Sequence, residues 1–270
     1  MAVQEMAGQK RTEGLWLAVI GSAVLFFLIL PTLIVIPMSF SDAAYLEFPP
    51  KEWSLRWYRE YFGSAEWMAA TRTSIVAAIL TTLIATPLGA LAAYGLHCSS
   101  TRIRNAAQIL VVMPIVVPII LIAVGVFHLY AKLGLNYTLA GVVIAHVALA
   151  LPFVIITVLS GLKSYDFNQE LAARSMGASR PRAMLDVTLP QVKFSVQAGA
   201  FLAFITSLDE VVVAMLISGG EYATITRRMF NALRDQIEPT VAAISTCLIA
   251  ISVLALIGIQ LIGRRGRGER

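Results

Sequence analysis

The chain has 270 residues, of which 58% are hydrophobic and only 14% are charged, and its mean hydropathy is +0.77. Soluble domains carry about 25% charged residues, so a soluble fold of this length could not bury so much apolar surface. Composition therefore predicts an integral membrane protein. The net charge of +5 is explained by basic residues beside membrane spans and not by nucleic-acid binding.

The first predicted element is an uncharged stretch of 28 residues, 14–41. A signal peptide has a hydrophobic region of only about 7–15 residues, and no small-residue cleavage site follows this stretch. A helix needs about 20 apolar residues to cross a bilayer. We therefore expect 14–41 to be a retained transmembrane span.

The connection that follows, 42–72, is rich in aromatic residues: Trp53, Trp57, Tyr58, Tyr61, Phe62 and Trp67. Trp and Tyr prefer the boundary between water and membrane, which favours a short amphipathic helix lying in that boundary. A second hypothesis makes this connection an external gate, with Trp57 and Tyr58 beside the substrate pathway.

Five further apolar stretches are long enough to cross a bilayer. They are 73–101, 105–131, 133–162, 194–220 and 239–263. Only 194–220 contains charged residues, namely Asp209 and Glu210. The sequence therefore predicts an all-α integral membrane fold with six transmembrane helices, forming one domain over residues 1–270.

An even number of spans places both termini on one side of the membrane. The segments on that side carry 13 Lys and Arg residues, against 8 on the other side. Basic residues accumulate in cytoplasmic segments. We therefore expect both termini, and the connection 163–193, to lie in the cytoplasm.

A charged insert, 165–190, separates the fourth and fifth predicted spans, and it reads NQELAARSMGASRPRAMLDVTLP over 168–190. Strong helix formers predict a short helix that ends at about Met176. Gly177 then suits the left-handed conformation that often follows a helix.

A second short helix is predicted after this glycine. Ser179 can cap it, and Pro181 falls in its first turn, where the missing N–H group is unimportant. It is expected to end before Pro190, because the residue before a proline disfavours helical geometry. Two exposed helices with apolar and basic side chains predict a surface that docks into a groove on another protein.

Ala172-Ala173, Gly177 and Leu189-Pro190 together resemble the cytoplasmic EAA signature of binding-protein-dependent ABC importer permeases. In that family the loop docks on the ATP-hydrolysing subunit. One position departs from the pattern: Leu171 stands where the signature has glutamate, and Glu170 lies one place earlier. The resemblance implies ATPase coupling by Glu170, Ala172, Ala173, Gly177, Ala178, Arg182, Leu189 and Pro190.

Two other segments narrow the resemblance. SLRWY at 54–58 and SLDEVVVAMLISG at 207–219 are similar to the second permease of spermidine/putrescine-type importers. The resemblance implies a bacterial inner-membrane protein that imports a polyamine, with gamma-aminobutyrate or another amino-acid-like solute as the alternative. It also implies a second permease subunit, two ATP-binding subunits and an extracytoplasmic solute-binding protein as partners.

The chain itself contains no Gly-Lys dipeptide, so it has no Walker A loop to hold ATP phosphates. ATP and magnesium are therefore expected to bind to partner subunits, with no cofactor in this chain. Its sequence offers no catalytic cluster and no metal-ligand spacing. A membrane enzyme is accordingly a weak alternative.

Asp209 and Glu210 are the acids inside a predicted span. A charge near the bilayer centre costs at least about 2.5–3.5 kcal/mol, so it normally faces protein or water. Neighbouring helix positions lie about 100° apart, which lets one carboxylate face a pathway and the other a neighbouring helix. Attraction of a cationic substrate and a structural polar contact both remain open.

Three further expectations concern polar residues near the spans. His128 and His146 are expected to be packed and hydrogen-bonded. The connection 221–238, which contains several arginines, is expected to be a solvated external loop.

An autonomous channel or ion-coupled carrier would also explain six spans and the two acids, but it leaves the insert 165–190 without a purpose.

Overall fold

The computed structural model describes residues 2–235 and 238–265, and the regular structure in this part of the chain is helical. This confirms the all-α class. The α-helices are α1 Ala2–Met38, α2 Arg56–Gly63, α3 Ala65–His97, α4 Thr101–Val116, α5 Ile119–Leu133, α6 Leu139–Lys163, α7 Asn168–Ser175, α8 Arg180–Ala183, α9 Leu189–Gln191, α10 Lys193–Asp209, α11 Val212–Ile217, α12 Ile225–Asp235 and α13 Thr240–Arg265. A π-helical turn, Met184–Thr188, joins α8 to α9, and a short 3₁₀ turn, Gly220–Tyr222, precedes α12.

Four of the described helical segments are long and apolar enough to cross a membrane: Trp16–Met38, Ala65–His97, Leu139–Lys163 and Thr240–Gly258. The pair α4 and α5 is also apolar, but its two helices meet at 92°. The predicted span 105–131 therefore consists of two helices with a sharp bend between them. Val117 is extended because it precedes Pro118, and a residue before proline avoids helical geometry.

The predicted span 194–220 is also broken. Helix α10 ends at Asp209, Glu210 is extended with φ −68° and ψ 122°, and α11 begins at Val212. A continuous helix over this stretch was a wrong prediction. After the break, α11 packs against α5.

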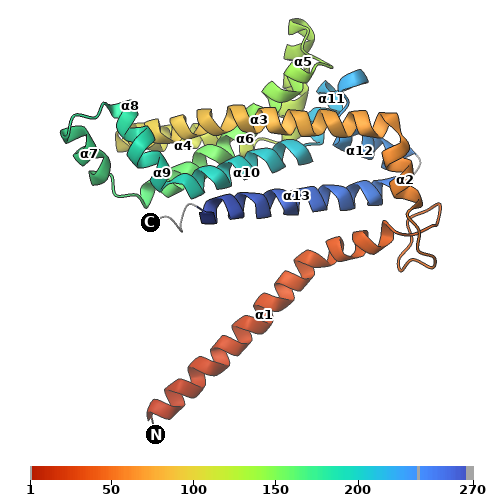
Figure 1. Ribbon diagram of the computed structural model, residues 1–270, viewed down its shortest axis with the longest axis horizontal. Coiled ribbons are helices and arrows are strands. Elements are labelled where there is room, and N and C mark those ends of the chain that lie inside the picture. Colours follow the sequence, from red (N-terminus) through yellow and green to blue (C-terminus); the bar gives the residue numbers. More distant parts are fainter. Residues whose placement is uncertain (1, 236–237, 266–270) are drawn as a thin grey trace. The chain divides into compact units, whose positions relative to one another are not determined.

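The described residues form two compact units, one made of 2–63 with 238–249 and the other of 64–235 with 250–265. The single domain proposed from the sequence stays a prediction. In the larger unit, α3, α6 and α10 pack side by side and form the core (Figure 1).

Small residues allow the three core helices to approach closely. Val154 of α6 lies between Gly89 of α3 and Gly199 of α10. A Cβ atom on Gly89 would lie 2.6 Å from Val154 Cγ1, and one on Gly199 would lie 3.3 Å from the same atom. Because lipid offers no hydrophobic driving force between helices, such close contacts are a main source of helix association in membranes.

The first turns of α3 contact α12 and the turn before it. Arg228 forms an ion pair with Glu66, and the Ile225 N–H donates to Ser74 Oγ at 2.8 Å. The expectation of a solvated loop over 221–238 was wrong for 225–235, which form the helix α12. Its apolar and basic residues repeat at helical spacing, so one face becomes buried, as at Ile225.

The last turns of α3 contact the insert instead. Tyr94 Oη donates a hydrogen bond of 2.6 Å to Glu170 of α7. The insert and α12 therefore lie at opposite ends of α3, as Figure 1 shows for the larger unit. This agrees with the sequence assignment of their two connections to opposite sides.

Candidate functional site

The first half of the insert ends as its sequence predicts. Helix α7 is followed by Gly177 in the left-handed region, with φ +97°. The Gly177 N–H donates to the Arg174 carbonyl at 3.0 Å, and the Ala178 N–H donates to the Ala173 carbonyl at 3.1 Å. This is the Schellman arrangement, which satisfies the last carbonyls of a helix and fixes the direction of the next segment.

The second half differs from the prediction. Ser179 holds the N-cap position of α8, but its side chain makes no capping hydrogen bond. The helix does not end before Pro190, because a π-helical turn widens the chain and the Leu189 N–H donates to the Met184 carbonyl. Pro190 then falls within this continuous helical stretch, in the first turn of α9.

The insert presents apolar and basic side chains to its surroundings. We call its exposed residues Leu171, Arg174, Met176, Arg182 and Leu185 the coupling surface. Met176 is 84% exposed, more than any other large apolar side chain among the described residues. Arg182 Nε lies 3.4 Å from Asp186 Oδ2, but both groups are exposed and such a pair contributes little to stability.

The other signature positions divide between surface and interior. Ala172, Gly177 and Pro190 are exposed, and Ala173, Ala178 and Leu189 are partly buried. Glu170 is completely buried and does not lie on the coupling surface.

The Glu170 carboxylate is bound from two sides. Tyr94 Oη donates to its Oε1 at 2.6 Å, and Thr188 Oγ1 donates to its Oε2 at 2.5 Å. Arg180 Nε lies 3.4 Å from Tyr94 Oη, and this hydrogen bond raises the pKa of the Arg180 guanidinium. Sequence reasoning missed Tyr94, Thr188 and Arg180, because nothing local to those residues links α3 to the insert.

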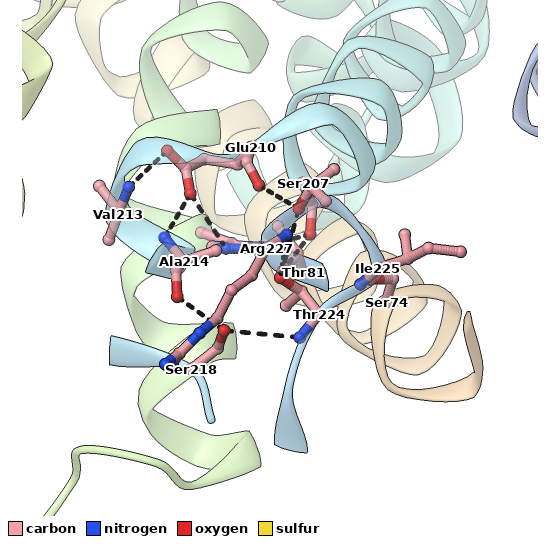
Figure 2. Close-up of polar contacts among 12 residues, drawn as sticks. Ser74, Thr81, Ser207, Glu210, Val213, Ala214, Ser218, Thr224, Ile225 and Arg227 are labelled. Atoms are coloured by element: carbon pink, nitrogen blue, oxygen red, sulfur yellow. Dashed lines mark hydrogen bonds and ion pairs between the residues drawn. The ribbon is translucent and has the colours of Figure 1, made fainter. Parts of the chain in front are cut away.

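Asp209 and Glu210 have different surroundings, and the cause is the break in the helix between them and not their angular spacing on a continuous helix. Figure 2 shows the Glu210 carboxylate turned toward the first backbone amides of α11. The Val213 N–H donates to Oε1 at 2.8 Å and the Ala214 N–H donates to Oε2 at 2.7 Å. Glu210 therefore caps α11 in place of an ordinary N-cap residue.

Asp209 is exposed and borders a cavity of about 680 Å³. The walls of this Asp209 cavity are mostly apolar and come from the bend between α4 and α5, from α6 and from α10. They include Pro114, Pro118, Phe153, Leu202 and Ile205. A carboxylate beside an apolar wall is suited to hold a cation that carries an apolar chain.

A buried polar network joins the core helices close to Glu210. His146 Nδ1 lies 2.7 Å from Ser207 Oγ, and the Ser207 hydroxyl donates to Thr81 Oγ1 at 3.4 Å. His146 Nε2 faces Glu210 Oε2 at 3.8 Å. His146 is thus packed and hydrogen-bonded, as expected, whereas His128 is exposed on α5 and that part of the expectation was wrong.

The network is extended by backbone groups and threonine hydroxyls. Thr226 Oγ1 donates to the Glu210 carbonyl at 2.7 Å, which ties α12 to the break between α10 and α11. Sequence reasoning missed these hydroxyl groups, since serine and threonine are common in membrane helices. Among the side chains that the structure describes, no three His, Cys, Asp or Glu residues cluster as metal ligands do.

Trp57 and Tyr58 lie on α2, in the smaller unit. This helix confirms the short amphipathic helix expected in 42–72. Trp57 is buried and its Nε1–H donates to the Ala43 carbonyl at 3.1 Å, while Tyr58 Oη lies 2.7 Å from Ser39 Oγ. Both contacts hold α2 against the segment that follows α1, and a role beside the substrate pathway stays a prediction.

Comparison with known proteins shows to which family the chain belongs. The family model of the binding-protein-dependent transport system inner membrane component matches residues 85–268. The chain belongs to this family. It is the permease subunit of an ABC importer and is not itself an enzyme, because ATP is hydrolysed by separate subunits.

Individual relatives agree with this. The spermidine/putrescine transport system permease protein PotC of Haemophilus influenzae is 29% identical over 239 residues, which cover 88% of this chain and 93% of PotC. The putrescine transport system permease protein PotI of Escherichia coli is 27% identical over 246 residues, which cover 88% of this chain and 87% of PotI. The resemblance proposed from the sequence is thereby confirmed.

A solved structure shares the fold. It is a bacterial alginate ABC transporter in complex with an alginate pentasaccharide-bound periplasmic protein, and one of its chains matches with a TM-score of 0.70 and 15% identity. The match covers 95% of this permease and 96% of that chain. The permease thus shares its fold with a chain of that ABC transporter.

Proposed function

We propose that this permease imports a polyamine across a bacterial inner membrane. Two observations support this: PotC and PotI resemble nearly the whole chain, and Asp209 provides a carboxylate at an apolar cavity. A polyamine carries ammonium groups along a methylene chain. The carboxylate can attract the former, and the walls of the Asp209 cavity can contact the latter.

The proposed topology has six crossings, with both termini in the cytoplasm. It counts α4 with α5 as one bent crossing and α10 with α11 as another. The excess of basic residues on the cytoplasmic side supports it. A second permease, two ATP-binding subunits and an extracytoplasmic solute-binding protein complete the proposed importer.

In this importer the coupling surface docks on an ATP-binding subunit. Its apolar side chains, foremost Met176, fill a groove, and Arg174 and Arg182 surround them with positive charge. Movement of the ATP-binding subunits then shifts the insert, and the pathway opens in turn to either side. ATP and magnesium stay in the partner subunits throughout.

The observation that carries the substrate proposal is the exposed Asp209 carboxylate. The test is uptake by the complete importer in proteoliposomes, supplied with solute-loaded binding protein and ATP. We expect Asp209→Asn to lower the uptake rate about tenfold, which corresponds to losing one charge-assisted contact. Asp235→Asn is the control, because Asp235 is an exposed acid at the end of α12.

The same assay separates the candidate solutes. Unlabelled spermidine or putrescine is expected to compete with labelled putrescine, whereas gamma-aminobutyrate is not. An uptake rate that is unchanged in Asp209→Asn contradicts the role of this carboxylate. Stronger competition by gamma-aminobutyrate than by the polyamines contradicts the assignment of the solute.

A further inference from the structure

Among the described residues, the side chains of Glu170 and Arg180 connect the insert to Tyr94 of α3, and the hydrogen bond to Glu170 is the shorter one. Helix α7 packs chiefly on α8 and on the π-helical turn, which belong to the insert itself. From α7, the Glu170 side chain reaches Tyr94 near the end of α3. The ring contact between Phe167 and His97, with centroids 5.6 Å apart, is a second tie at the base of α7.

The burial of Glu170 indicates that its two hydrogen bonds are needed. Its side chain is fully buried, and a buried carboxyl group without partners is strongly destabilising. One partner is Tyr94 of α3, and the other is Thr188 at the end of the π-helical turn. One side chain therefore connects α7 with α3, which is 76 positions away, and with the π-helical turn, which is 18 positions away.

Tyr94 contacts both halves of the insert. Its hydroxyl donates to Glu170 of α7, and it accepts from Arg180 Nε at the start of α8. The Arg180 guanidinium also lies over the Tyr94 ring, 5.6 Å from its centroid. A displacement of either insert helix is thus transmitted to the same residue of α3.

Apolar contact alone does not fill the space between the insert and α3. A cavity of about 200 Å³ lies there, with Pro87 and Leu91 of α3 on one side and Met184 and Leu189 of the insert on the other. Its lining is mostly apolar. Side chains that do not touch transmit movement poorly, so the polar contacts beside this cavity gain importance.

We propose that Glu170 and Tyr94 form a transmission clamp, in which Glu170 is a positioning residue that fastens the insert to α3. Through this clamp, movement of the docked ATP-binding subunit reaches the core helices. Glu170 acts inside the permease and makes no contact with the ATP-binding subunit. The inference rests on the proposed docking of the coupling surface.

The test uses the complete importer in proteoliposomes and measures three quantities: retention of the ATP-binding subunits on purification, the rate of ATP hydrolysis, and solute imported per ATP hydrolysed. Tyr94→Phe removes the hydroxyl group and keeps the ring below Arg180. Glu170→Ala removes the carboxylate, and Glu170→Gln keeps an oxygen that can accept the Tyr94 hydrogen bond.

We expect Tyr94→Phe and Glu170→Ala to retain the ATP-binding subunits and to hydrolyse ATP. Solute imported per ATP is expected to fall at least about fivefold, as a lost charge-assisted hydrogen bond implies. The double variant should be no worse than either single variant, because both remove one link. Glu170→Gln should recover part of the ratio.

The matched control is Tyr165→Phe. Tyr165 lies at the base of the insert, and its buried hydroxyl has no hydrogen-bond partner among the described residues. The Tyr165→Phe variant is expected to import as much solute per ATP hydrolysed as the unaltered permease. A change equal to that of Tyr94→Phe overturns the proposal, because it attributes the effect to removal of any tyrosine hydroxyl near the insert.

Two further outcomes also overturn the clamp. One is an unchanged ratio in an intact complex of Tyr94→Phe and Glu170→Ala. The other is loss of the ATP-binding subunits from both variants with an unchanged ratio in the complex that remains, which would place Glu170 at the docking surface. Failure of the docking proposal is recognised separately, because then the unaltered permease retains no ATP-binding subunit.

Discussion

At the residue scale, Asp209 and Glu210 show how one break in a helix creates two roles. The chain stops being helical between them, so Asp209 is exposed at a cavity and Glu210 turns back to the amides of α11. Without the break both would lie on a continuous helix, where only their angular spacing would separate them. Surroundings, and not residue type, decide what each carboxylate does.

The different surroundings of the two acids predict different effects of substitution: one substitution should lower stability, and the other should lower uptake. Glu210→Ala removes both acceptors from the start of the six-residue helix α11, and loss of such a cap destabilises by about 0.5–2 kcal/mol. We expect a lower melting temperature of the purified importer in lipid nanodiscs. Asp209→Asn should lower uptake and leave the melting temperature unchanged. Equal melting temperatures for Glu210→Ala and the unaltered importer would contradict the capping role.

At the element scale, local signals in the sequence predicted some boundaries and missed others. Gly177 ends α7 as predicted, because a left-handed glycine after a helix is a property of the local chain. Pro118 and Pro190 behave differently from each other: a sharp bend forms beside the first, and the helix continues through the second by way of a π-helical turn. Whether the chain bends beside a proline or stays helical through it depends on tertiary contacts, which the hydrophobic periodicity of the sequence does not reveal.

Part of the candidate site was likewise predictable from the sequence, and part was not. The motif identified the insert, and the two acids in a span were conspicuous by their charge. The link from Glu170 to Tyr94 joins residues 76 positions apart and could not be inferred from spacing. Likewise, the hydroxyl groups around His146 became recognisable only once α3, α6 and α10 were placed together.

The close approach of the core helices predicts a position-specific effect on α3. A Cβ atom on Gly89 would meet Val154 Cγ1 at 2.6 Å and Val154 Cβ at 2.7 Å, and neither atom is the end of a flexible chain. We expect Gly89→Ala to force α3 and α6 apart and to destabilise the permease by about 1–3 kcal/mol.

Gly95→Ala is the matched control, because it lies on the same helix and a Cβ atom there meets nothing within 4 Å. Its stability should equal or slightly exceed that of the unaltered permease, since alanine is the better helix former. The measurement is the fraction of monodisperse permease after heating in mild detergent. Equal losses in both variants would show that the contact with Val154 is not limiting.

At the scale of the larger unit, the packed helices α3, α6 and α10 separate two functional ends. The insert is fastened near Tyr94, and α12 is fastened near Glu66 and Ser74, at the other end of the same helix. A rigid helix between the ends can carry displacement from one to the other. In the proposed topology, which rests on the excess of basic residues on one side, the insert lies in the cytoplasm and α12 lies outside.

This arrangement predicts which positions a membrane-impermeant thiol reagent reaches in intact spheroplasts. The free cysteines Cys98 and Cys247 are first replaced by serine, and single cysteines are then introduced at Met176 and Arg234, which are both exposed. We expect the Arg234→Cys variant to react from outside. The Met176→Cys variant should react only after the membrane is opened, because the proposed topology places the insert in the cytoplasm. Reaction of both from outside would contradict the placement of the insert and α12 at opposite ends of α3. The reverse order of reaction would leave that placement intact and invert the orientation, and the docking of the ATP-binding subunits on the insert would then fail with it.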